Sequence, residues 1–111
     1  MKTSKDLNRF KKEFVRWQNK LGLTCYRACF EQKNMPGDYA RINVNEQGQV
    51  ALVSLCTEKD PDYNSPEQHA KHEALHLLTN RLVWLAQQRY VTESEISREW
   101  EAVVRRLEKV L

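Results

Sequence analysis

Residues 65–88 read SPEQHAKHEALHLLTNRLVWLAQQ, a segment that opens with a helix start signal and continues with helical periodicity. Ser65 fits the N-cap, Pro66 the first helical position, and Gln68 stands three residues after the cap. The segment therefore predicts a helix from Pro66 to about Gln88. Its apolar positions share one stripe of the helix: Ala70, Ala74, Leu78 and Leu85.

A second stripe of this helix carries the His-Glu-Ala-Leu-His motif of residues 72–76. Residues four apart stack on one face of a helix with about 3.6 residues per turn, so His72 and His76 can hold one metal ion. Neutral imidazole nitrogen is a good zinc ligand. Glu73 lies next to His72 around the helix, and its carboxylate can take a proton from metal-bound water without displacing a histidine.

The motif therefore predicts a Zn²⁺ site with His72 and His76 as ligands and Glu73 as the catalytic base. The alternative interpretation is a surface pair of histidines that binds no metal. His69 lies one turn earlier on the same side of the helix. We expect it not to be a ligand, because a catalytic zinc usually keeps one coordination position open for water.

The third protein ligand is expected from the last helix. No histidine follows His76, so a carboxylate is expected, with Tyr90 as a less favoured donor. If the last two helices form an antiparallel hairpin that turns near Tyr90, depth along the hairpin favours Glu101. The helical wheel favours Glu99 instead, because it lies closer to the apolar stripe. Both glutamates remain candidates.

The remaining elements are predicted from periodicity and turn signals. A first helix over 5–21 has apolar residues at three- and four-residue steps, and Thr3, Ser4 or Asp6 can cap its start. Strands are predicted over 24–32, 39–44 and 49–56, with turns at 35–38 and 45–48. Short turns between neighbouring strands favour an antiparallel meander.

A polar stretch from Thr57 to Ser65 ends the sheet, and Thr92 with Glu95 forms a capping box for a last helix that runs to the C-terminus. The prediction is an α+β fold in one domain, 1–111, with the order α-β-β-β-α-α. It has an N-terminal helix, a three-stranded antiparallel sheet, the helix with the His-Glu-x-x-His motif, and a C-terminal helix hairpin.

Composition is that of an ordinary globular chain, with 111 residues, 41% apolar and 30% charged. No apolar run approaches the roughly 20 residues of a membrane span, and the N-terminus lacks the apolar segment of a secretory signal. We therefore expect a cytoplasmic protein without membrane contact, and leave its oligomeric state open. The three cysteines are interpreted as reduced apolar residues, with a catalytic thiol as the less favoured alternative.

The net charge of +3 is too small to identify a partner. Positive residues cluster at the two ends of the chain, and they are interpreted as the solvated faces of amphipathic helices. The clusters comprise Lys2, Lys5, Arg9, Lys11, Lys12 and Arg16 near the start, and Arg98, Arg105, Arg106 and Lys109 near the finish.

The element order, the His-Glu-Ala-Leu-His-Leu-Leu segment and the closing Val-Val-Arg-Arg-Leu-Glu together resemble a known group. The chain looks like the small zinc metallopeptidases encoded by phages and prophages. These are minimal zincins of the gluzincin type, distantly similar to SprT-like proteases. The resemblance covers Leu7 to Leu107, and its specific part is the His-Glu-x-x-His motif.

The resemblance implies that His72 and His76 bind zinc, that Glu73 is the catalytic acid/base, and that a glutamate of the last helix is the third ligand. The chain departs from the group at Trp100, where an acidic residue is expected; here Trp100 stands between Glu99 and Glu101.

Three functions are compatible with these patterns. The leading one is a zinc-dependent peptidase that cleaves a protein in a bacterial host cell. An extended peptide substrate then binds by strand addition at the strand over 49–56 or its neighbour. The second is a zincin-fold binding or regulatory module without turnover. The third is a DNA-associated protein, based on the basic ends and the distant SprT-like similarity.

Overall fold

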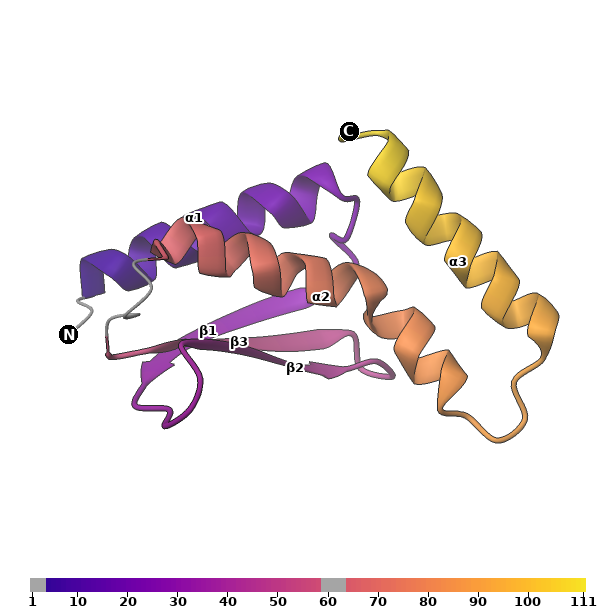
Figure 1. The fold of residues 1–111 in the computed structure, drawn as a ribbon, viewed down its shortest axis with the longest axis horizontal. Helices are drawn as coiled ribbons and strands as arrows, with labels where there is room; N and C mark the ends of the chain where they lie inside the picture. The colour runs from indigo at the N-terminus through magenta and orange to yellow at the C-terminus, as the bar shows by residue number, and fades with distance from the viewer. Residues whose placement is uncertain (1–3, 59–63) are drawn as a thin grey trace.

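The computed structural model of the chain describes residues 4–58 and 64–111. The predicted α-β-β-β-α-α order is confirmed, and the bounds differ from the predicted ones by a few residues (Figure 1). The predicted Thr3 cap, Lys2 of the basic cluster and residues 59–63 of the polar stretch lie outside the described residues. The elements are α1 (Ser4–Lys20), β1 (Arg27–Lys33), β2 (Ala40–Asn45), β3 (Val50–Cys56), α2 (Pro66–Ala86) and α3 (Glu93–Glu108).

The sheet is mixed, so the predicted antiparallel meander is wrong. β3 is the central strand in the order β1-β3-β2; it runs parallel to β1 and antiparallel to β2. The turn at 45–48 does join a β2–β3 hairpin. The segment between β1 and β2, however, does not join neighbouring strands, because β3 lies between them. β3 is the most apolar strand and gains most from the centre, where Ala51, Val53 and Leu55 are fully buried.

Both α1 and α2 lie on one face of this sheet and enclose the core between two layers (Figure 1). Phe10 and Phe14 of α1 are fully buried and pack edge-on against Phe30 of β1, with ring centroids 6.4 and 5.5 Å apart. α2 contributes Ala70, Ala74, Leu77 and Leu78 to the same core. This burial fixes which side of α2 faces solvent.

Helix starts are the best-predicted local features. Ser65 caps α2 in a complete capping box with Gln68, and Pro66 occupies the first turn. Thr92 and Glu95 form the same arrangement at the start of α3. α3 diverges from the layer of α1 and α2 (Figure 1), and Val103 is its buried residue. The C-terminal helix therefore packs at the end of the domain rather than over the sheet.

A buried polar cluster joins the strand side of the molecule to α2 and α3. Glu46, 6% exposed, accepts hydrogen bonds from the Tyr26 hydroxyl at 2.7 and 2.8 Å and from Asn80 Nδ2 at 2.8 Å. Arg81 lies 3.6 Å from Glu46 and 3.4 Å from Glu99. Burial and the neighbouring Glu46 carboxylate raise the pKa of the Tyr26 hydroxyl. These contacts hold the middle of α2 against the β2–β3 hairpin.

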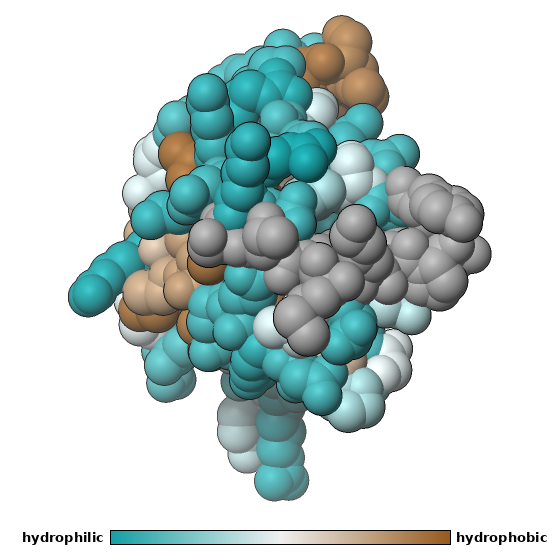
Figure 2. Space-filling view, turned by 90° about the vertical axis from the view of Figure 1, so that its left-hand side faces the viewer, coloured by the Kyte–Doolittle hydropathy of each residue, from teal (hydrophilic) through white to brown (hydrophobic). Residues whose placement is uncertain are grey.

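The face shown in Figure 2 is largely hydrophilic, and its apolar residues gather in small separate areas.

All three cysteines are free: Cys56 is buried, Cys29 is half-buried and Cys25 is exposed. Within the described residues, no helix is long and apolar enough to cross a membrane.

Replacement Tyr26→Phe tests the buried cluster. It removes the hydroxyl donor from Glu46, so we expect the free energy of unfolding at pH 7 to fall by about 1–3 kcal/mol. The raised pKa of Tyr26 means that the folded state keeps a proton which the unfolded chain releases above about pH 10. The free energy of unfolding of the wild type therefore falls as the pH rises past that value. The variant has no hydroxyl at position 26 and lacks this loss.

Urea unfolding at pH 7 and at pH 10.5 to 11 (roughly one half to one unit above the tyrosine reference pKa) measures the difference. The difference in free energy of unfolding between wild type and variant should be smaller at the higher pH. Tyr90→Phe is the matched control, because Tyr90 is 85% exposed. A gap that is constant or wider at high pH contradicts the assignment.

Candidate functional site

The three functional residues of the motif differ in exposure on α2. His72 and His76 are exposed, whereas Glu73 is 5% exposed and lies between them and the buried stripe of Ala70, Ala74 and Leu77. The capping box and Pro66 fix where the helix begins, and the core fixes its rotation. The two histidines and the glutamate are thus presented by a rigid element, as a catalytic constellation requires.

The two imidazole rings meet at one side of α2. His72 Nε2 and His76 Nε2 lie 3.1 Å apart, and the ring centroids are 4.7 Å apart. Two nitrogen ligands on a tetrahedral zinc at about 2.0–2.1 Å stand roughly 3.3–3.4 Å apart, so the rings are close to the geometry of a shared ion. The same separation also suits a direct hydrogen bond in which one Nε2 donates and the other accepts.

Burial raises the pKa of the Glu73 carboxyl above its usual value; His72 and His76 oppose this effect, and Asp38 adds to it. A carboxylate that is partly withdrawn from water holds a proton more readily than an exposed one. This is the property that a general base needs if it is to accept a proton and then release it to a leaving group.

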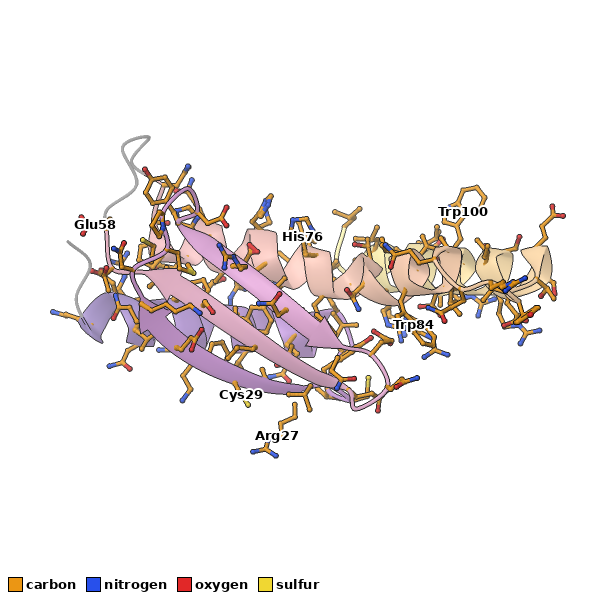
Figure 3. All side chains as sticks on the ribbon, turned by 90° about the horizontal axis from the view of Figure 1, so that it is seen from below. Arg27, Cys29, Glu58, His76, Trp84 and Trp100 are labelled. Carbon is orange, nitrogen blue, oxygen red and sulfur yellow. The ribbon has the colours of Figure 1, made fainter. Side chains whose placement is uncertain are left out.

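A cleft of about 570 Å³ opens beside the histidines between α2 and the edge strand β2. In Figure 3, His76 projects on the side of the molecule where β2 forms the edge, away from Arg27 and Cys29 of β1. The cleft is therefore lined by β2, the neighbour of the third predicted strand. The lining comprises residues 37–42 of the β2 side and His69, His72, Glu73, His76, Thr79, Asn80 and Val83 of α2.

Neither predicted third ligand lies in this cleft. Glu99 contacts Arg81, which is about 140° around α2 from His76 at roughly 100° per residue. The Glu101 side chain is 59% exposed and lies 3.9 Å from Arg105. Within residues 4–58 and 64–111, no three His, Cys, Asp or Glu side chains form a group that could hold a metal ion. The third ligand stays a prediction, open between Glu101 and Glu99.

Two polar residues of the cleft were not singled out from the sequence. Asp38 follows the Pro-Gly turn before β2 and pairs with Arg41 at 2.7 Å. Asn80 stands one turn after His76 and donates to the buried Glu46. The turn signal at 35–38 locates Asp38 in a loop, but only the packing of β2 beside α2 brings it to the histidines. Asn80 could have been found from its i+4 spacing to His76.

His69 and Tyr90 have different surroundings. His69 lines the cleft, half-buried, with its ring 6.3 Å from that of Tyr39. Tyr90 is 85% exposed in the connection between α2 and α3, away from the cleft lining.

No family model matches the chain, and neither the curated proteins nor the solved structures contain a significant match. The site is therefore interpreted from its own residues, with the family resemblance as an expectation.

Replacement Glu73→Gln in metal-free protein tests the burial of this carboxyl. Because the pKa of Glu73 is raised in the folded state, its ionisation opposes folding once the pH exceeds the unfolded value of about 4.3. We expect the metal-free variant to melt at a higher temperature than wild type at pH 7. This difference in melting temperature should shrink as the pH falls towards about 4.3 and be absent below that value.

Thermal unfolding by circular dichroism in the presence of a chelator gives the comparison. Glu108→Gln changes the same group at an exposed position of α3 and should leave the melting temperature unchanged. A Glu73→Gln protein that melts below wild type at pH 7 would show that the carboxylate form is the one stabilised by the fold.

Proposed function

We propose that this chain is a zinc-dependent peptidase, a minimal zincin that hydrolyses a peptide bond in an extended segment of a protein substrate. The observation that carries the proposal is the pair of Nε2 atoms 3.1 Å apart, beside a buried glutamate, in a cleft next to an edge strand. The resemblance to small phage-encoded zinc metallopeptidases supports the same function. We place its action in the cytoplasm of a bacterial host cell.

Two imidazole donors suit zinc: His72 and His76 would hold the ion through Nε2, and a third protein ligand is needed to complete the site. A bound zinc ion supplies Lewis-acid polarisation of the attacking water and of the substrate carbonyl. The Glu73 carboxylate would take a proton from the attacking water, whose oxygen bonds to the carbonyl carbon, and return it to the amine nitrogen released when the C–N bond breaks. Its placement on the same rigid helix keeps it next to the water without a separate loop movement.

Substrate binding is assigned to β2. This strand pairs with β3 on one side and forms the edge of the sheet on the other, so its outer backbone groups are available to an added strand. Residues 39–42 of the strand side line the cleft opposite the histidines. A peptide that adds antiparallel or parallel to β2 thus passes directly across the exposed face of α2.

A third ligand completes the proposed site. Glu101 and Glu99 remain the proposed donors, and either of them requires α3 to bring its carboxylate to the cleft. Among the described residues, Asp38 and Glu73 are the carboxylates that already line it. The side chains of Asp38 and its partner Arg41 are 49% and 42% exposed, so exchange of that ion pair for a metal ion costs little.

The alternative function is a zincin-fold binding module without turnover. It is favoured by one observation: Glu99 is held by Arg81 on the far side of α2, away from the histidine cleft. Such a module retains the cleft and the edge strand, and it binds a peptide without cleaving it.

Metal analysis combined with a cleavage assay distinguishes the two functions. Protein purified without chelator should carry about one zinc per chain, and His72→Ala with His76→Ala should remove it. Glu73→Gln should keep the metal and lose cleavage of a peptide library, read by mass spectrometry, by at least about 10²-fold. Glu108→Gln is the control that should change neither property.

Cleavage that persists in Glu73→Gln would refute the assigned base. Zinc retained without cleavage, together with hydroxamate binding to the metal, would establish the binding module instead. Metal affinity of Glu101→Gln, Glu99→Gln and Asp38→Asn then identifies the third ligand as the variant that loses about 10-fold or more.

A further inference from the structure

A basic hollow lies where the C-terminal ends of α1 and α3 come together, near the chain terminus marked C in Figure 1. It has a volume of about 470 Å³. Four positively charged side chains line it: Lys20 from α1, and Arg105, Arg106 and Lys109 from α3 and its end. The other lining residues are Asn19, Leu21, Gly22 and Ala102, so no carboxylate of the described residues lines the hollow.

Helix dipoles account for only part of this charge. Each helix C-terminus carries roughly half a negative charge, so the two ends together balance about one of the four positive charges. The formal net charge of the whole chain is +3, and without these four side chains it would be −1. Four of the 18 Lys and Arg side chains of the protein therefore meet at this one place.

Two carboxylates lie near one cation of the hollow: Arg106 also lines a neighbouring pocket with Glu46 and Glu99, and both glutamates are already shared with Arg81. Arg105 lies 3.9 Å from Glu101, but both side chains are mostly exposed, at 70% and 59%, and such a pair is weak. In the described part of the chain, no ion pair involves Lys20, Arg106 or Lys109. These cations are available to a ligand from outside.

The positive surface continues along α1 beyond the hollow. Lys20 lies 5.0 Å from the centre of the Trp17 ring, and Arg16 and Lys71 lie 5.2 and 5.0 Å from it. Lys20 thus belongs to both groups of cations. Arg16 is paired with Glu13, so the proposed ligand contacts are the four cations of the hollow, which suit a ligand that presents several negative charges in a row.

We propose that the basic hollow binds the phosphate backbone of a nucleic-acid strand. Arginine and lysine are the side chains that recognise phosphate, and arginine does so through two parallel hydrogen bonds. A recess between two helix ends admits a strand, whereas a flat bilayer surface cannot enter it. In the part of the chain that the structure describes, the hollow and the histidine cleft share no lining residue, so this binding is independent of the proposed zinc chemistry.

Fluorescence anisotropy with a labelled single strand of about 20 nucleotides, from roughly 50 to 200 mM salt, tests the proposal. Four phosphate contacts predict a slope of log affinity against log salt of about −3. The triple variant Arg105→Gln, Arg106→Gln, Lys109→Gln should reduce the slope to about −1 and weaken binding at low salt at least about 10-fold. Glu73→Gln should bind the labelled strand with the affinity and salt slope of the wild type.

The control variant removes three charges elsewhere: Lys5→Gln, Lys12→Gln, Arg98→Gln, all at exposed positions. It should change the affinity by no more than about twofold. An equal loss in both triple variants would show that net charge alone drives binding, and no binding at low salt would overturn the proposal outright. If the triple variant does not fold, single Arg105→Gln and Lys109→Gln proteins should each lower the slope by about 0.7.

Vesicles of phosphatidylcholine with phosphatidylserine form the second arm. Sedimentation of the wild type with these vesicles, abolished by the hollow variant and accompanied by no binding to the labelled strand, would assign the hollow to a lipid surface and refute the proposal. Binding to the strand that depends on the hollow residues supports it.

Discussion

Burial of one face of α2 is the contact on which the rest of the structure depends. Ala70 and Ala74 are fully buried in the core with Phe10 and Phe14, so the backbone of α2 lies close to its neighbours. This packing sets the rotation of the helix. The rotation in turn exposes the two histidines, withdraws Glu73 from water, and places all three beside β2.

The same packing determines what each element can contribute to the site. α3 meets α2 on the side of Arg81, where Glu99 and the buried Glu46 share that guanidinium. The helix that the sequence suggested as a ligand donor therefore serves in this structure as a support for the middle of α2. The strand side supplies Asp38, from the loop before β2, and Arg41, from β2 itself, to the cleft instead.

Local features were predictable from the sequence, and non-local ones were not. The capping boxes at Ser65 and Thr92 depend on residues three apart, and the His72–His76 pair depends on helical spacing, so both could be derived from sequence. Strand order depends on which strand gains most by central burial, and turn length alone does not reveal it. The position of Glu99 depends on the crossing of two helices, a property that neither the helical wheel nor the hairpin depth determines.

The sheet topology has a consequence for how this chain folds. The central strand is the last of the three to be synthesised, so β1 has no partner until β3 has emerged. A parallel pair cannot form by a local hairpin, and the apolar side of α1 stays uncovered until the strands and α2 are in place. No early fragment of the chain contains a complete core, and folding is therefore expected to be cooperative and late, with its rate set by loop closure rather than by helix formation.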